Sequence, residues 1–302
     1  MIGYFGPAGT FTHQALLTFS DAPAQPFGTV GHALDAVRSG DVAQALVPIE
    51  NSVEGGVTTT LDNLSSGRAP LAIVREVLLP VQFVLAVRPG TRLEDVHRVL
   101  THPHAHAQTR DWLAAHVPGA AITEGGSTAA AAAEVSDPES RYDAAVCAQV
   151  AADLYGLEAA ADHIADNGGA VTRFVLVQQP GKIPEPTGAD KTTLVAYMYA
   201  DHPGALLEIL EQFAVRGVNL CRIESRPTKK NLGDYCFSID AEGHVDEPRM
   251  AEALMGLHRV CARVTFLGSY PRADSVRPKI ARGFSDEEFI DAREWFAGVV
   301  GR

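Results

Sequence analysis

Lysine is missing from the first 181 residues of this 302-residue chain, and the first one is Lys182. Residues 1–180 carry 9 basic and 19 acidic side chains and hence a net charge of −10, against −12 for the whole chain. This composition argues against nucleic-acid binding, which depends on basic surfaces. It also excludes a lysine Schiff base with a substrate or with pyridoxal phosphate in this region. An anionic ligand there must be bound by arginine, by neutral donors or by helix N-termini.

Long apolar runs and closely spaced cysteines are missing too. No apolar run approaches the roughly 18 residues of a membrane helix, and Met1–Tyr4 lacks the basic residues that begin a signal peptide. The four cysteines are scattered without a C-x-x-C pair, which predicts reduced thiols in a cytoplasmic protein. The hydrophobic content of 46% is typical of a soluble globular protein, so we expect no membrane partner.

Two breaks in composition predict the domain organisation. Residues 179–189 contain three prolines and two glycines, which is typical of a linker, and a second break falls near Pro271. We therefore predict domains at 1–180 and 191–270, a linker at 181–190 and a tail at 271–302. In the tail, the spacing of Ser285 and Glu288 predicts a capping box and an amphipathic helix, which would pack on the same chain or on a subunit partner.

The predicted domains differ in fold. In residues 1–180, short apolar runs alternate with helical patterns, which indicates an α/β architecture. One large sheet and two smaller lobes with a cleft are both compatible with this pattern. Residues 191–270 show the order βαββαβ, which is typical of a ferredoxin-like unit.

Two short motifs allow more than one interpretation. The chain opens with Gly3, Gly6 and Gly9 before Thr10, a spacing that fits neither a dinucleotide-binding loop nor a Walker loop. This turn could present donors to an anion, or Thr10 could simply cap a helix. The triplet His102, His104 and His106 resembles a metal cluster, but Pro103 interrupts it and no Asp, Glu or Cys stands within three residues on either side. We expect a loop leading into a helix, and no metal.

Polar residues follow one predicted buried strand and precede another. Glu50, Asn51 and Ser52 come after the apolar run 45–49, at the strand end where open α/β sheets bind ligands. Glu50 could be an acid or base, or a solvated turn residue. Thr172 and Arg173 stand at the mouth of the last predicted strand of this region, Phe174–Val177. Arg173 could bind a carboxylate in a bidentate manner or form a structural salt bridge.

The ordered set of these motifs resembles the bacterial monofunctional prephenate dehydratases over residues 1–270, and residues 191–270 resemble an ACT regulatory domain. The motifs that carry the resemblance are Gly6-Pro-Ala-Gly-Thr10-Phe-Thr12, Val47-Pro-Ile-Glu-Asn51-Ser52, Thr101-His-Pro-His104 with Gln108, Thr172-Arg173-Phe174, Gly204-Ala205-Leu206 and Glu224-Ser225-Arg226-Pro227.

The resemblance implies a fold, an activity and a regulator. The fold is two α/β lobes similar to periplasmic type II binding proteins, with the active site in the cleft. The activity is the conversion of prephenate to phenylpyruvate without a cofactor, on the route to phenylalanine. Phenylalanine is the implied effector at the ACT domain, and the implied assembly is a homodimer or a dimer of dimers. Two alternatives stay open: a dehydratase acting on arogenate, which the same motifs would serve, and a non-enzymatic amino-acid sensor, against which the pair Thr172 and Arg173 argues.

The resemblance also implies roles for particular residues. Thr172 is an oriented donor to the departing hydroxyl, and Arg173 orients Thr172 or stabilises its lobe. Glu124 matches a family carboxylate only if the following two glycines are an insertion, and Glu224 could form a structural pair with Arg226 instead of binding the effector. The full implied sets are Thr172, Arg173, Asn51 and Ser52 as catalytic residues; Thr10, Glu50, Thr101, Gln108 and Phe174 as substrate-binding residues; and Gly204, Ala205, Leu206, Asn219, Leu220, Glu224, Ser225 and Arg226 as effector-binding residues.

Overall fold

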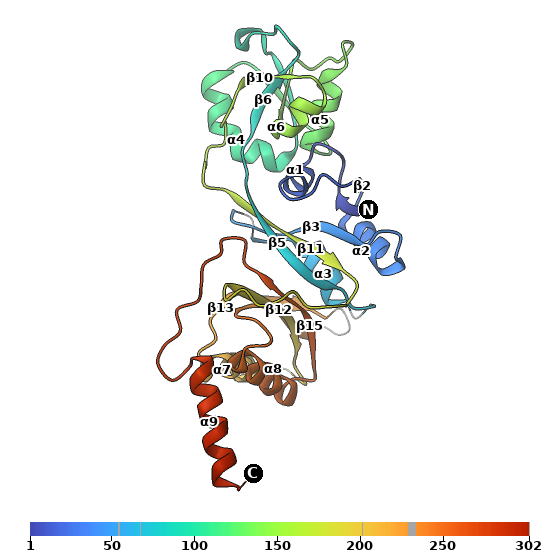
Figure 1. The fold of residues 1–302 in the computed structure, drawn as a ribbon. Helices are drawn as coiled ribbons and strands as arrows, with labels where there is room; N and C mark the ends of the chain where they lie inside the picture. Colours follow the sequence, from blue (N-terminus) through green and yellow to red (C-terminus); the bar gives the residue numbers. More distant parts are fainter. Residues whose placement is uncertain (54, 67, 201, 229–233, 302) are drawn as a thin grey trace. The chain divides into compact units, whose positions relative to one another are not determined.

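The computed structural model describes residues 1–53, 55–66, 68–200, 202–228 and 234–301 (Figure 1). The chain divides into two compact units. Unit 1 consists of Met1–Ala36, Ala45–Val57 and Val77–Phe174, and unit 2 consists of Val37–Gln44, Thr58–Glu76 and Val175–Arg302. No helix in the described part of the chain is long and apolar enough to cross a membrane.

A six-stranded sheet has the order β2-β1-β3-β11-β5, and the short β4 pairs with β3. Strands β1 and β2 are parallel, whereas β3 and β4 are antiparallel. The central strands β3 and β11 are apolar and buried along most of their length, as expected for strands covered on both faces. The elements are β1 (Ile2–Phe5), α1 (Phe11–Leu17), β2 (Ala24–Phe27), α2 (Val30–Ser39), β3 (Gln44–Asn51), β4 (Gly55–Gly56), α3 (Thr58–Ser65), β5 (Ala72–Pro80) and β11 (Val171–Gln178).

A second sheet has the order β10-β6-β9-β7-β8. Strand β7 is parallel to β8 and β9, and β6 is antiparallel to β9 and β10. Its elements are β6 (Val84–Val87), the 3₁₀ helix η1 (Leu93–Asp95), β7 (Arg98–Thr101), α4 (Pro103–His116), β8 (Ala121–Glu124), α5 (Thr128–Ser136), β9 (Ala144–Cys147), α6 (Gln149–Leu154) and β10 (Glu158–Ala161).

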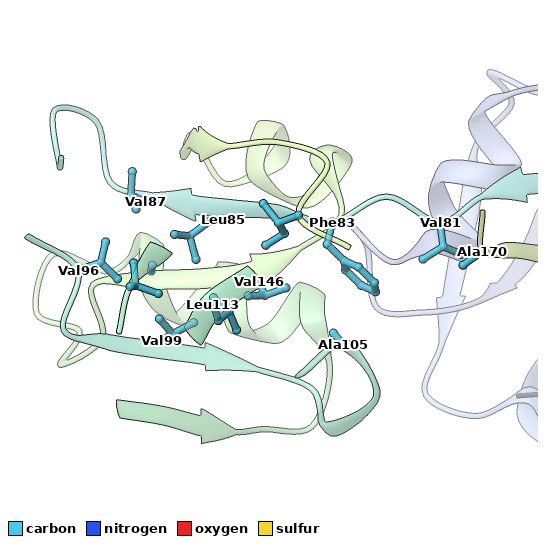
Figure 2. Close-up of a cluster of buried hydrophobic side chains, with 13 residues drawn as sticks. Val81, Phe83, Leu85, Val87, Val96, Val99, Ala105, Leu113, Val146 and Ala170 are labelled. Atoms are coloured by element: carbon cyan, nitrogen blue, oxygen red, sulfur yellow. The ribbon is translucent and has the colours of Figure 1, made fainter. Parts of the chain in front are cut away.

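Each face of the second sheet has its own core. Successive side chains of a strand point to opposite faces. Leu85 and Val87 of β6 therefore pack with Leu113 of α4 on one face (Figure 2), and Val84 and Ala86 pack with alanines of α5 on the other. Helices thus cover both faces, which explains why β6 and β9 are buried at every residue.

The two sheets settle the alternative left open for residues 1–180, because the structure has two sheets instead of one. We call the six-stranded sheet with α1 the first lobe, and the five-stranded sheet with α4, α5 and α6 the second lobe. The chain passes between the lobes twice, and the Val81 amide donates to the Ala170 carbonyl at 2.8 Å where the two connections meet (Figure 2). The predicted α/β class with two lobes is confirmed.

The predicted ferredoxin-like order βαββαβ is also confirmed. A four-stranded antiparallel sheet has the order β13-β14-β12-β15, and α7 and α8 cover one of its faces (Figure 1). Leu194 and Ile239 of the sheet are buried against Phe213 of α7 and Leu257 of α8. The elements are β12 (Asp190–Tyr197), α7 (Ala205–Ala214), β13 (Leu220–Pro227), β14 (Tyr235–Glu242), α8 (Pro248–Val260) and β15 (Arg263–Pro271).

The opposite face of this sheet is polar and packs on α3 and the start of β5, which belong to the same unit. The Lys191 ammonium contacts the Glu76 carboxylate at 2.8 Å, and the two side chains are 10% and 1% exposed. Arg226 of β13 pairs with Asp62 of α3, also at 2.8 Å. Gly268 of β15 has φ +136°, and a Cβ there would lie 2.2 Å from the carbonyl oxygen of Ile73. Unit 2 therefore joins residues 58–76 to the ferredoxin-like sheet, a grouping that the sequence did not predict.

The tail contains α9 (Asp286–Val299), which begins with a capping box between Ser285 and Glu288. Arg293 of α9 donates to Glu252 of α8 at 3.1 Å, a contact within unit 2, and the rest of the helix projects away from α7 and α8 (Figure 1). No residue of α9 is buried, and the side chains of Trp295 and Phe296 are 69% and 57% exposed.

Candidate active site

Unit 1 contains a pocket of about 260 Å³ whose lining comes from both lobes. This size is close to the lower end of small-molecule sites, roughly 300 to 1,000 Å³. Its lining residues are Phe5, Gly6, Thr10, Phe11, Thr12, Pro48, Asn51, Val81, Phe83, His102, His104, Ala105, Gln108, Gly126, Ser127, Thr128, Thr172 and Phe174.

The charge of this lining is unusual for a site that would bind an anion. Among the described residues that line the pocket, none is Lys, Arg, Asp or Glu. Three helices instead begin at the pocket, since Thr10, His102 and Ser127 are the N-caps of α1, α4 and α5, and Ser127 accepts from the Ala130 amide at 3.0 Å. A helix N-terminus carries a partial positive charge and unpaired amides, so these helix starts favour a negatively charged group in the pocket.

Asn51 and Thr172 form a hydrogen-bonded pair on the first lobe. The Asn51 Oδ1 accepts from the Val53 amide at 2.8 Å, which fixes the orientation of the side-chain amide. The Asn51 Nδ2 therefore donates to the Thr172 hydroxyl oxygen, also at 2.8 Å. Since this oxygen already accepts a hydrogen bond, the hydroxyl proton of Thr172 can be donated to a ligand in the pocket. The sequence placed both residues at one site, and the structure brings them together.

Arg173 and Glu50 do not line this pocket. Strand β11 begins at Val171 and not at Phe174, so Thr172, Arg173 and Phe174 alternate between its faces. Thr172 and Phe174 line the pocket, whereas the Arg173 guanidinium is buried and lies 3.4 Å from the Glu50 carboxylate. The contact is the structural ion pair that was one of the two interpretations of Arg173.

Ser52 also lies outside the lining, where it joins the end of β3 to the start of β11. Its amide donates to the Val171 carbonyl, and its hydroxyl accepts from the Val171 amide, both at 2.9 Å. Thr101 is fully buried and donates to the Val146 carbonyl at 3.2 Å. Each of these hydroxyls holds a strand end next to a residue of the pocket.

Two of the other predicted residues, Thr10 and Gln108, line the pocket. Thr10 is the N-cap of α1 and accepts from the His13 amide at 3.4 Å. This contact is the helix cap that was one of the two interpretations of Thr10. Glu124 is half exposed and lies 3.0 Å from His106, outside the lining. The described residues contain no group of three or more His, Cys, Asp or Glu that could hold a metal ion.

The sequence missed several residues of the lining. His102 and His104 were weighed as metal ligands and interpreted as a loop leading into a helix, and they were not proposed as residues that bind the substrate, nor was the aromatic pair Phe11 and Phe83, with ring centroids 5.3 Å apart. Ser127 carried a usable signal, because a serine before a run of alanines is a typical helix start. The aromatic residues carried no such signal, since they come from segments far apart in the chain.

The predicted effector residues lie on two segments of unit 2. Gly204 is the N-cap of α7 with φ +93°, which favours glycine, and Ala205 and Leu206 follow it in the helix. The alternation of β13 places Ser225 on the side of the sheet that α7 covers, and Glu224 and Arg226 on the opposite side. Asn219 and Leu220 stand where β13 begins, and the Asn219 carbonyl accepts from the Glu242 amide at 2.8 Å.

Comparisons with known proteins agree with one another. A family model described as prephenate dehydratase matches residues 2–182. A prephenate dehydratase of Amycolatopsis methanolica is 49% identical over 301 residues, covering 99% of this chain and 97% of that protein. The crystal structure of a prephenate dehydratase from Arthrobacter aurescens in complex with L-Phe is 50% identical with a TM-score of 0.93, covering 100% and 99%. A structure named GqqA, a novel type of quorum quenching acylase, is 32% identical with a TM-score of 0.81, covering 89% and 97%.

Proposed function

Since this chain belongs to the prephenate dehydratase family, we propose that the pocket of unit 1 is where it converts prephenate to phenylpyruvate. The activity is that of a lyase in phenylalanine biosynthesis. The observation that carries the location is the Thr172 hydroxyl, held by Asn51 at 2.8 Å on a lining with no fixed charge among its described residues. The two similar proteins at 49% and 50% identity are both named prephenate dehydratase, whereas the one named an acylase shares 32%.

The reaction depends on the orientation of the substrate in the pocket more than on a strong acid or base. The bond between the ring and its carboxylate breaks, its electron pair moves through the ring, and the C–O bond to the hydroxyl breaks. One proton is taken up, so that prephenate and a proton give phenylpyruvate, carbon dioxide and water. The ring becomes aromatic, which drives the reaction. Thr172 donates a hydrogen bond to the departing hydroxyl, and the pocket fixes the geometry.

The absence of Lys and Arg from the described lining fits this reaction. A cation on the carboxylate that departs would stabilise the substrate more than the transition state and slow the loss of carbon dioxide. The sequence suggested Arg173 as the nearby cation, but its pairing with Glu50 on the other face of β11 assigns it to the support of the strand. We propose that neutral donors and the N-termini of α4 and α5 bind most of the substrate.

A direct assay tests this proposal. We expect purified protein to release phenylpyruvate from prephenate, with or without a chelator, because the described residues offer no metal site. Loss of activity with EDTA and its recovery with a metal would contradict the cofactor-free reaction. The same assay with arogenate in place of prephenate tests whether the protein is an arogenate dehydratase, because only the relative rates of turnover of the two substrates separate these activities. Binding without turnover of either compound would favour the sensor.

We propose further that phenylalanine inhibits the enzyme by binding to unit 2 as an ACT domain. The solved Arthrobacter aurescens relative is in complex with L-Phe. In this chain the N-terminus of α7 offers backbone donors for a carboxylate, and Leu206 is 39% exposed beside it. We keep the domain division of 1–180, 191–270 and their linker as a proposal, with the addition that residues 58–76 pack in unit 2.

Replacing Gly204 by alanine should weaken inhibition by phenylalanine. The residue has φ +93° with no atom within 4 Å of an added Cβ, so the substitution strains the backbone without a clash. The expected result is a several-fold higher inhibitory concentration of phenylalanine, measured for each variant against its own activity without effector. Gly283→Ala is the matched control, because Gly283 has φ +92° and an equally open surrounding. Equal inhibition curves for the two variants would argue against the site.

We propose that the enzyme is cytoplasmic and forms a homo-oligomer, either a dimer or a tetramer made of two dimers. None of the four cysteines, all of which the structure describes, is in a disulfide, and burial raises the pKa of the Cys147 thiol to about 12, which keeps this thiol uncharged. Exposed apolar side chains of α9, including Trp295, support self-association. Light scattering that gives the mass of a single chain at micromolar concentration would contradict the oligomer.

A further inference from the structure

Asp166, in the segment between β10 and β11, forms hydrogen bonds with the backbone in the middle of helix α4. Its carboxylate oxygens accept from the Asp111 amide at 3.1 Å and from the Trp112 amide at 2.9 Å, and its own amide donates to the Gln108 carbonyl at 2.7 Å. In a regular α-helix, the Trp112 amide donates to the Gln108 carbonyl, four residues earlier. Asp166 therefore binds both groups of one helical hydrogen bond.

These contacts fall where two parts of α4 meet. The described α4 residues that line the unit 1 pocket all come at or before Gln108, whereas Leu113 packs in the core of the second lobe (Figure 2). The Thr109 hydroxyl donates to the Ala105 carbonyl at 2.8 Å, a bond to the preceding turn that often bends a helix. The Asp166 carboxylate binds two successive amides here, as an acidic N-cap binds the first amides of a helix. Asp166 thus fixes the pocket-lining part of α4 to its core-packed part.

Asp166 also precedes the strand that carries the Thr172 hydroxyl. Thr172 follows it by six positions, and between them the Ala170 carbonyl accepts from the Val81 amide at 2.8 Å. The segment that starts at Asp166 therefore leads from Gln108 on the second lobe to Thr172 on the first lobe. The side chains of Gln108 and Thr172 both line the pocket.

We infer that Asp166 is a positioning residue that fixes the Gln108 side chain in the pocket relative to Thr172, and this inference rests on the proposed function. Both side chains act on one substrate molecule, so a shift of Gln108 misaligns the substrate with the Thr172 hydroxyl. A misplacement of about 1 Å can lower a rate by on the order of 100-fold. Asp166 is described by the structure and lies outside the pocket lining, so it acts through Gln108 and not by contact with the substrate.

A double-mutant cycle between Asp166 and Gln108 tests this role. In Asp166→Ala we expect kcat/KM for prephenate to fall roughly 5- to 20-fold. In a protein that already carries Gln108→Ala, the same change should lower kcat/KM less than about twofold, because the side chain that Asp166 positions is gone. Asp166→Asn keeps one acceptor oxygen and should give an intermediate loss. Asp162→Ala is the matched control, because Asp162 is exposed in the same segment and lies outside the pocket lining, and it should leave kcat/KM unchanged.

Thermal unfolding separates positioning from a general structural role. Asp166 is exposed, so its replacement leaves no cavity, and its lost bonds to α4 should lower the unfolding midpoint equally with and without Gln108. If Asp166→Ala does not fold, Asp166→Asn serves in the same cycle. Equal losses of kcat/KM with and without Gln108, or no loss at all, would overturn the inference and leave the proposed function intact. If the wild type does not convert prephenate, the proposed function fails and the inference fails with it.

Discussion

Replacing Thr172 by alanine should lower the kcat for prephenate by roughly 100-fold or more, the usual effect of removing one aligned donor from a reacting group. Asn51 donates to the Thr172 hydroxyl oxygen at 2.8 Å, which leaves the hydroxyl proton available to the substrate, whereas the Thr10 hydroxyl in the same lining donates to the Phe5 and Pro7 carbonyls. Without the Thr172 hydroxyl, the hydroxyl of prephenate must leave without an aligned donor. Single-turnover measurements of phenylpyruvate formation would report this step directly.

Two further variants make the result for Thr172 interpretable. Thr172→Ser keeps the hydroxyl and should retain most of the activity, whereas Asn51→Ala leaves the hydroxyl but removes its partner and should show an intermediate loss. Thr172→Ala also removes the hydroxyl oxygen that accepts from the Asn51 amide, and the loss of such a hydrogen bond costs about 1 kcal/mol of stability, so the unfolding midpoint of this variant must be measured. A folded Thr172→Ala protein with near wild-type turnover would show that the catalytic assignment is wrong.

Replacing Lys191 by methionine should destabilise unit 2 by about 3–5 kcal/mol, the usual effect of removing one partner of a buried ion pair. The Glu76 side chain is 1% exposed, and its two oxygens accept from the Lys191 ammonium at 2.8 Å and from the Ala273 amide at 2.9 Å. Without the lysine, the buried carboxylate of Glu76 loses the cation that contacts it at 2.8 Å. Urea unfolding followed by circular dichroism measures the change in free energy.

The double variant Lys191→Met with Glu76→Gln is the control for this prediction. It removes both charges, keeps the shapes close to the originals, and should recover much of the lost stability. The exposed pair Lys182 and Glu185, whose side chains are 83% and 77% exposed, gives a second control, because its disruption should leave the urea midpoint unchanged. An unchanged urea midpoint in Lys191→Met would contradict a structural role for the buried pair.

The parts of the fold that the sequence predicted are those with a strong local signal. The apolar runs of β3 and β11 and the order of elements between 190 and 271 follow directly from hydrophobic periodicity. Helix α3 was missed, because Thr58–Ser65 begins with three threonines, which have a modest helix propensity. Its contact between Asp62 and Arg226 joins residues 164 positions apart, and no local pattern reports such a contact.

The sequence predicted only part of the candidate site, because the rest depends on a strand boundary and on contacts between segments that are far apart in the chain. The sequence placed the start of the last strand at Phe174, three residues after its observed start at Val171. With the observed start, alternation puts Thr172 and Arg173 on opposite faces, so the error in the boundary concealed the separation of the two side chains. The sequence predicted a loop leading into a helix at the histidines of α4 and no metal, and their place in a pocket depends on which segments the two lobes bring together.

The exposed helix α9 also carries a tryptophan whose intrinsic fluorescence reports on its surroundings. The chain has two tryptophans, of which Trp112 is partly buried and stacked on His116, with ring centroids 4.3 Å apart. Trp295 has 69% of its surface in water, so its emission responds to whatever covers it. A blue shift of the fluorescence on raising the protein concentration, absent in Trp295→Phe, would report association through α9 without any label, and the same signal could follow how phenylalanine changes the assembly.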